Sequence, residues 1–189
     1  MPKETPTISA EQILESEFDY IAQTATQAND DRSSVVSFFV IAVGSPLAAI
    51  FSASLPGFNE KDTDILFGGL FLVLSVLGTT TILQLARLRA AWHESMLAMN
   101  HMKEFLIKNS DSDIAGAFRW TTKTAPAKFK INSVSFYQAL EVAILSGMLF
   151  GAFIFFLLNF DLSIKWIICI FSALAFTGFQ IYLYRRLLN

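Results

Sequence analysis

Four long stretches without a charged residue constrain this chain most. They run from Ser33 to Asn59, from Ile65 to Ala86, from Val142 to Phe160 and from Trp166 to Tyr184. A helix needs roughly 20 residues to cross a hydrocarbon core of about 30 Å, so each stretch can form a membrane span. Only 16% of the 189 residues are charged and 19 are Phe, which excludes a disordered chain and an ordinary water-soluble enzyme. We predict an all-α membrane protein with four transmembrane helices.

The basic residues around these spans predict the orientation of the chain. Of its 14 Lys and Arg residues, all but Lys61 and Lys165 lie at the termini or between the second and third spans. An excess of Lys and Arg marks the cytoplasmic side of a membrane. We therefore predict a multi-pass protein of the cell inner (cytoplasmic) membrane with both termini cytoplasmic. Because the first 33 residues are polar and acidic, we expect no cleaved signal peptide there.

The segments outside the spans predict a helical cytoplasmic layer. Ser9 and Gln12 have the spacing of a capping box, and an amphipathic helix follows them. The second span continues to Lys108 without Gly or Pro, which predicts one helix of about 40 residues with a long cytoplasmic extension. We divide the chain into an N-terminal amphipathic helix (1–33), a first hairpin (34–86), a cytoplasmic helix with a connecting segment (87–133), and a second hairpin with a short cytoplasmic tail (134–189).

Apolar faces predict where the two cytoplasmic helices meet each other or a partner. Phe18 and Ile21 lie on one face of the N-terminal helix, and a stripe of near-heptad spacing on the second helix contains Trp92, Met96, Met99 and Met102. Met residues near His93 and His101 are also soft metal ligands, but Met commonly fills packed helix seams. We interpret the stripe as packing and predict no metal and no cofactor.

The spans contain one ionisable candidate and two rows of small residues. Glu141 lies seven residues inside the apolar run that begins at Val134. It either lines an ion path or lies at the cytoplasmic interface, where it reaches lipid headgroups or pairs with Arg87 or Arg185. Small residues at four-residue spacing let helices approach closely, within one subunit or between copies, and for self-association we favour the third span. The rows are Ala143, Gly147 and Gly151 in the third span and Gly44, Ala48 and Ser52 in the first.

A basic and aromatic segment returns the chain to the third span. Such a segment at the cytoplasmic face is typical of contact with anionic lipid headgroups. The candidates are Arg119, Trp120, Lys123, Lys128 and Lys130. The sequence has no phosphate-binding glycine loop and a net charge of −2, so we expect no nucleic-acid partner.

Two short features resemble a group of bacterial proteins. One is the polar helix ending in Gln27-Ala28-Asn29-Asp30-Asp31-Arg32 before the first span, and the other is Trp92 with Met99-Asn100 on the long helix after the second. Together they resemble small four-helix bacterial inner-membrane proteins found as membrane components of anti-phage defence systems. The resemblance implies a protein that senses envelope disturbance or permeabilises the membrane alongside a cytoplasmic partner.

These observations lead to three functional hypotheses. We expect a non-enzymatic homo-oligomer in the lipid bilayer that senses or transmits a membrane event to a cytoplasmic protein partner, in the setting of antiviral defence. The first alternative is an oligomeric pore or membrane-permeabilising effector, and the second is an ion or metal transporter. Two His and one Cys allow few catalytic constellations, so we predict no enzyme.

Overall fold

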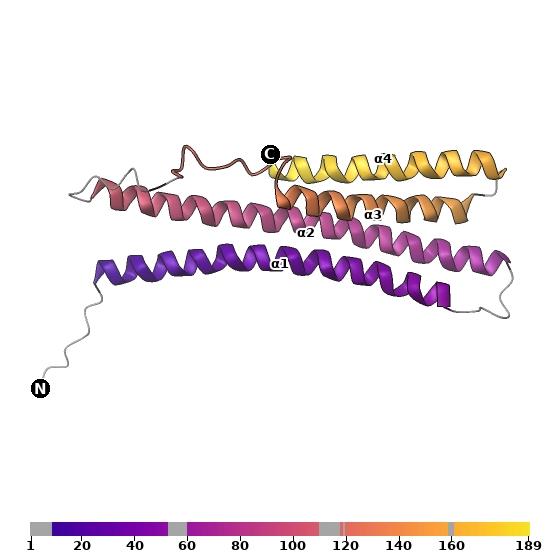
Figure 1. Cartoon of the computed structure of the whole chain (residues 1–189), viewed down its shortest axis with the longest axis horizontal. Helices are drawn as coiled ribbons and strands as arrows, with labels where there is room; N and C mark the ends of the chain where they lie inside the picture. The colour runs from indigo at the N-terminus through magenta and orange to yellow at the C-terminus, as the bar shows by residue number, and fades with distance from the viewer. Residues whose placement is uncertain (1–8, 53–59, 110–117, 119, 159–160) are drawn as a thin grey trace, which may run out of the picture.

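The computed structural model describes residues 9–52, 60–109, 118, 120–158 and 161–189, without the side chains of 49–52, 60 and 61. It contains four helices: α1 (Ala10–Ser52), α2 (Glu60–Lys108), α3 (Val134–Leu157) and α4 (Leu162–Leu188) (Figure 1). Every regular element in these ranges is helical, which confirms the predicted all-α class.

The helices differ in length by a factor of two. α1 has 43 residues and α2 has 49, whereas α3 has 24 and α4 has 27. At 1.5 Å per residue the first pair reaches about 65 to 75 Å and the second pair about 35 to 40 Å. Figure 1 shows α1 and α2 continuing side by side well beyond the ends of α3 and α4. The protein thus has a four-helix part and a two-helix extension.

Three of the four helices are long and apolar enough to cross a membrane. The candidate segments are Asp62–Lys108, Val134–Leu157 and Leu162–Leu188. α2 is far longer than a bilayer is thick, so the expected span 65–86 leaves about 20 residues, 87–108, outside the membrane. The expected first span, 33–59, lies partly outside the described residues, and its crossing of the membrane remains a prediction.

The start of α1 follows the predicted capping box. The Ser9 N–H donates to Gln12 Oε1 at 3.2 Å, and the Gln12 N–H donates to Ser9 Oγ at 3.2 Å. These two bonds satisfy backbone donors that have no partner inside the helix. From this start, α1 continues through Pro46 as a single helix.

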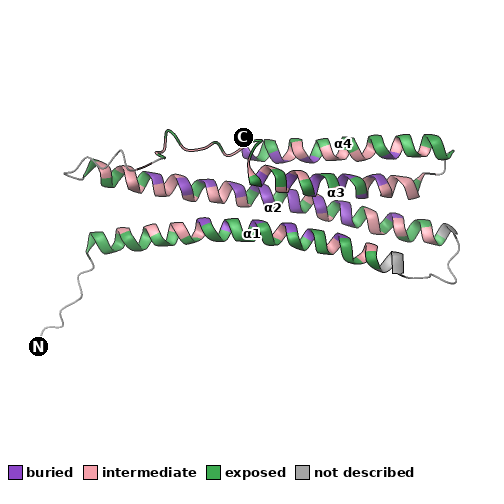
Figure 2. Cartoon of the chain, in the orientation of Figure 1, coloured by how far each residue is buried: buried purple, intermediate pink, exposed green. Residues whose placement is uncertain are grey.

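The core lies where all four helices overlap. Phe39 of α1, Ile82 and Leu85 of α2, Val142 of α3 and Tyr184 of α4 are almost fully buried there. α2 packs against the other three helices, and α3 packs against α4. In Figure 2 much of the surface of α4 is coloured as exposed, although this helix is strongly apolar. An exposed apolar surface of this kind suits contact with lipid.

Candidate functional site

The predicted small-residue row of the third span lies between α3 and α4. A Cβ atom on Gly147 would collide with the Thr177 hydroxyl and lie 2.7 Å from the Ala173 carbonyl oxygen. On Gly151 it would lie 2.9 Å from the Cys169 carbonyl oxygen. Of the two interpretations of this row, the structure shows packing within one chain, and α4 occupies the surface that we favoured for self-association.

The corresponding row of the first span is not packed against another helix at Gly44. Gly44 and Ala48 are exposed on α1, and a Cβ atom on Gly44 would meet nothing within 4 Å. The side chain of Ser52 lies outside the described residues. This face of α1 therefore has no neighbour at Gly44 within the described chain.

A buried polar cluster, which the sequence reading missed, links three helices inside the four-helix part. Gln180 of α4 donates through Nε2 to Ser146 Oγ of α3 at 2.9 Å and to Thr79 Oγ1 of α2 at 3.0 Å. Ser146 Oγ in turn donates to the Ser75 carbonyl oxygen at 3.1 Å. Bonds between membrane helices of this kind fix their register. The signal in the sequence is a single Gln inside the fourth uncharged stretch.

Glu141 is exposed on α3 and, among the described residues, forms no ion pair with Arg87 or Arg185. The Arg185 guanidinium instead lies 5.6 Å from the ring centroid of Phe129. Glu141 follows Gln138 by three residues, which places it about 4.5 Å farther along the axis of α3, away from its N-terminal end. The expected pairing with either arginine is therefore not formed.

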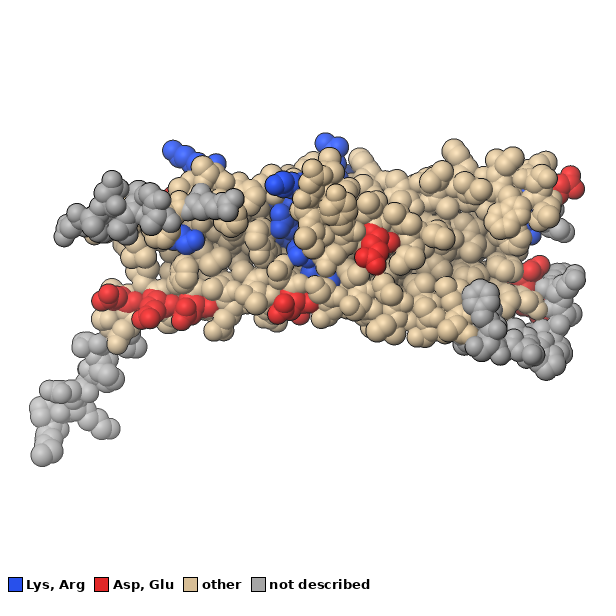
Figure 3. All heavy atoms as spheres, in the orientation of Figure 1, with Lys and Arg blue, Asp and Glu red and all other residues tan. Residues whose placement is uncertain are grey.

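A polar layer, here called the arginine layer, joins all four helices where the two-helix extension begins. Arg32 of α1 donates through Nε to Gln138 Oε1 of α3 at 2.8 Å. Arg89 of α2 donates through Nε to the Lys128 carbonyl oxygen at 3.0 Å. The hydroxyls of Ser135 (α3) and Tyr184 (α4) lie 2.7 Å apart. Figure 3 shows basic side chains forming a band across the molecule near this level.

The two arginines of this layer are unusually buried for charged side chains. Arg32 is 6% exposed and Arg89 is 8% exposed. Burial lowers the pKa of both guanidinium groups, and the charge of Arg32 lowers the pKa of Arg89 further. Within the described residues neither guanidinium has a carboxylate in ion-pair distance. Such groups are usually paired when buried.

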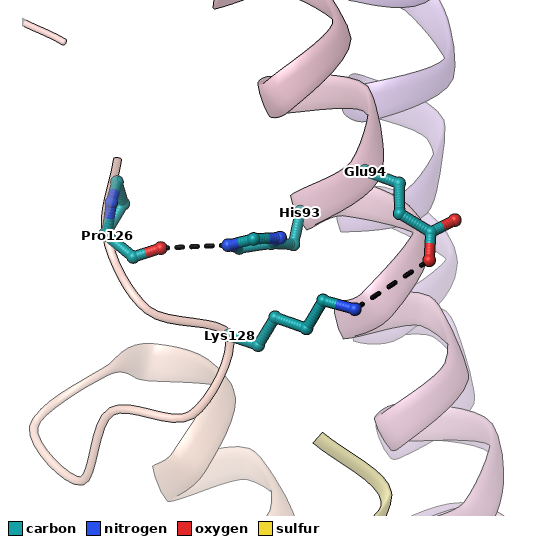
Figure 4. A network of polar contacts seen from close by, with 4 residues as sticks. All are labelled: His93, Glu94, Pro126 and Lys128. Carbon is teal, nitrogen blue, oxygen red and sulfur yellow. Dashed lines mark hydrogen bonds and ion pairs between the residues drawn. The ribbon is translucent and has the colours of Figure 1, made fainter. Parts of the chain in front are cut away.

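The segment 120–133, here called the strap, runs back along the C-terminal half of α2. Near its start, the Thr122 N–H and hydroxyl both donate to Glu104 Oε1, at 2.7 and 2.6 Å. Farther along, His93 Nε2 lies 3.0 Å from the Pro126 carbonyl oxygen and Lys128 pairs with Glu94 at 3.9 Å (Figure 4). The strap then ends at the arginine layer, where α3 begins.

Two groups on α2 that contact the strap have shifted pKa values. The two Thr122 hydrogen bonds lower the pKa of Glu104, because they favour the charged carboxylate. Burial lowers the pKa of His93, with the charges of Lys128 and Arg89 acting in the same direction. The carbonyl of Pro126 accepts from Nε2, so neutral His93 has its free lone pair on Nδ1, which is buried without a hydrogen-bond partner.

The predicted apolar stripe of α2 contacts two different neighbours, the strap and α1. Met96 is buried and accepts a weak hydrogen bond from Asn100, which also contacts the strap at the Thr121 carbonyl. Met102 instead lines a groove of about 550 Å³ between α1 and α2. Trp92, Met99, Phe18 and Ile21 are half-buried. The described residues contain no group of three or more His, Cys, Asp or Glu placed to bind a metal.

The lipid headgroup candidates lie mainly on the outer side of the strap. Lys123, Lys130 and Trp120 are exposed, and Lys128 is half-buried beside Glu94. Arg119 lies outside the described residues. The exposed ammonium groups of Lys123 and Lys130 are therefore accessible to lipid headgroups or to another molecule.

No known protein family matches the chain, and no curated protein or solved structure shows significant similarity to it.

Proposed function

We propose that this protein is a non-enzymatic, membrane-anchored transducer of the bacterial inner membrane. Four helices cross the bilayer, both termini are cytoplasmic, and the extension of α1 and α2 contacts a cytoplasmic protein partner. The observation that carries the proposal is the continuity of α1 and α2 from the four-helix part into the extension. A change in helix tilt within the bilayer moves the cytoplasmic end of the same helix, because nothing interrupts it.

The far end of the extension supports a role in binding a partner. Ile13 is 58% exposed and Phe105 is 56% exposed, on opposite helices of the groove between α1 and α2. Tyr20 and Leu106 are also exposed nearby in the sequence. Apolar side chains grouped in this way on a cytoplasmic surface are typical of an interaction site.

We further propose that copies associate edge to edge. Glu11, Glu15 and Asp19 of α1 are exposed, and Figure 3 shows acidic side chains gathered along the lower edge of the molecule, where α1 lies in Figure 1. Lys123, Lys130 and Arg186 are exposed on other elements. Copies in one membrane share an orientation, so the acidic edge of one copy can meet a basic surface of the next. The open face at Gly44 supports α1 as the membrane part of this contact.

Spin-label distances test the transducer proposal. Ile13→Cys and Phe105→Cys, made in a Cys169→Ser background, report the separation of α1 and α2 at the far end of the extension. We expect the distance distribution to shift between nanodiscs of short-chain and long-chain lipids, because bilayer thickness changes helix tilt. A pair of labels at Leu83 and Phe105, both on α2, is the control and keeps its distance. An unchanged distribution for the first pair in all bilayers would contradict the proposal.

The second candidate function is an oligomeric pore, as in membrane-permeabilising effectors of anti-phage defence. Glu141 supports it, because this exposed carboxylate lies on an apolar helix without an ion partner in the described chain. Voltage-sensitive dye in bacteria expressing the protein alone separates the two functions. Depolarisation that disappears with Glu141→Ala supports the pore, and an unchanged potential with both proteins supports the transducer.

A further inference from the structure

The arginine layer contains two positive charges that no acidic residue balances. Arg32 and Arg89 come from different helices and are less than a tenth exposed. Their hydrogen-bond partners, Gln138 and the Lys128 carbonyl, lie on either side of the start of α3 at Val134. The acidic residues closest in sequence do not pair with them: Glu94 pairs with Lys128, and Asp30 and Asp31 are exposed. Buried charges without an opposite charge are costly, so this arrangement calls for an anion.

The hydrogen-bond partners of the two guanidinium groups are all neutral. Arg32 donates to the side-chain oxygens of Gln138 and Asn29, and Arg89 donates to the carbonyl oxygens of Lys128 and Ala127. These partners satisfy Nε and Nη2 of each arginine, and the Arg89 guanidinium also lies 4.4 Å from the ring centroid of Trp92. Among the described residues, no carboxylate balances either charge. The hydrogen-bond partners also orient the two side chains, as expected for a site formed before its ligand binds.

One amino group of each arginine remains for a ligand. The Nη1 atoms of Arg32 and Arg89 have no hydrogen bond to a described residue. The polar side-chain atoms that are both sealed from solvent and unpartnered in the described chain are His93 Nδ1 and Gln180 Oε1. The two Nη1 atoms are not among them, so neither is fully sealed from solvent.

We propose that Arg32 and Arg89 together bind one phosphate group at the cytoplasmic boundary of the membrane. A phosphate offers several anionic oxygens, so it can accept hydrogen bonds from two guanidinium groups better than a monatomic anion can. The layer lies where the expected spans end, at the depth of the inner-leaflet headgroups, and basic pockets between helices at this depth bind phosphate headgroups. Lys130 and Arg185, both exposed at the nearby ends of the strap and α4, add to the attraction. The inference does not depend on the transducer role.

Two sources can supply this phosphate, and the experiment separates them. The full-length protein is unfolded thermally in maltoside micelles with added phosphatidylglycerol or with an added glycolipid that has no phosphate, and in the same micelles with inorganic phosphate or chloride at equal ionic strength. A higher melting temperature with added phosphatidylglycerol identifies a lipid headgroup. A higher melting temperature with inorganic phosphate identifies a soluble phosphate. No stabilisation in either comparison would overturn the proposal.

Variants show whether the arginine layer is the site. Arg32→Gln and Arg89→Gln are expected to weaken the binding of the stabilising ligand about tenfold, the loss expected for one charge-assisted hydrogen bond. Arg87→Gln is the matched control, because Arg87 is exposed and lies two residues from Arg89 on the same helix. An equal loss in Arg87→Gln would show general surface attraction and overturn the proposal.

Two further measurements guard against a variant that fails to fold. Arg89→Lys keeps the charge but loses the forked donor geometry, so we expect a folded protein with weaker binding. Native mass spectrometry of the wild-type protein needs no variant at all. We expect a phospholipid or phosphate adduct that survives mild activation, and a wild-type protein without any such adduct would contradict the inference.

Discussion

Replacing Gly147 with alanine tests whether close contact between α3 and α4 holds the four-helix part together. The new methyl group would collide with the Thr177 hydroxyl and lie 2.7 Å from the Ala173 carbonyl oxygen. The hydroxyl can rotate away, but then its hydrogen bond to the Ala143 carbonyl, at 3.2 Å, is lost. The carbonyl belongs to the backbone of α4, so this helix must move.

The size of the effect follows from these contacts. Overpacking in a tight core costs about 1–3 kcal/mol, and one hydrogen bond contributes about 1 kcal/mol. Gly44→Ala is the matched control, because a Cβ atom there meets nothing within 4 Å. Both changes share the same gain in helix propensity, about 1 kcal/mol, which cancels in the comparison. We therefore expect Gly147→Ala to lower the free energy of unfolding by about 2–4 kcal/mol relative to Gly44→Ala.

The assay is unfolding in mixed detergent micelles with increasing dodecyl sulfate. Trp166 reports the separation of α3 and α4 by fluorescence, because its ring centroid lies 5.2 Å from that of Phe155. Equal unfolding free energies for the two variants would refute the reasoning. A stable Gly147→Ala monomer that no longer cross-links to other copies would instead indicate that this row mediates self-association.

Three other predictions follow from the polar contacts. The pKa of His93 is lowered in the folded protein, so the unfolded chain binds the proton more readily below about pH 6.5 and stability falls as the pH drops below that value. Melting temperatures at several pH values check this, and His93→Gln removes the dependence whereas His101→Gln, at an exposed position, retains it. Glu104→Gln replaces the carboxylate that accepts the Thr122 hydrogen bonds with a neutral amide, so we expect faster hydrogen exchange of the Thr122 N–H. Glu94→Gln is the control. Gln180→Leu leaves Thr79 and Ser146 without their shared donor and should lower the free energy of unfolding by about 1–3 kcal/mol in the same micelle assay.

Local features of the fold could be predicted well from the sequence because their causes are local. The capping box at Ser9 and Gln12 depends on residues three apart, and the structure confirms it. The length of α2 follows from the absence of Gly and Pro between Gln84 and Lys108, although the helix of 49 residues is longer than the predicted 40 or so. Both predictions needed no knowledge of a distant partner.

Contacts between distant segments could not be predicted in the same way. The row at Gly147 indicated close packing, but this row alone does not say which helix packs against it. A complementary row of Cys169, Ala173 and Thr177, at the same four-residue spacing, was present in the fourth span and would have identified α4 as the partner. The strap offered no periodicity at all, so its contacts with Glu104 and His93 could be found only in three dimensions.

The arginine layer shows how one side chain can connect the membrane part to the extension. In the sequence, Arg89 counted only toward the charge bias that predicts the orientation, and Arg32 also ended the polar motif 27–32. In the structure, Arg32 links α1 to α3 through Gln138, and contact between these two helices is otherwise sparse. If Arg32 also binds a phosphate, as we propose, the bound anion and Gln138 act on the same guanidinium. Release of the anion then leaves an uncompensated buried charge beside Gln138, which weakens the attachment of α1 to the bundle. A change of headgroup at the inner leaflet would thereby reach the cytoplasmic end of α1 through an unbroken helix.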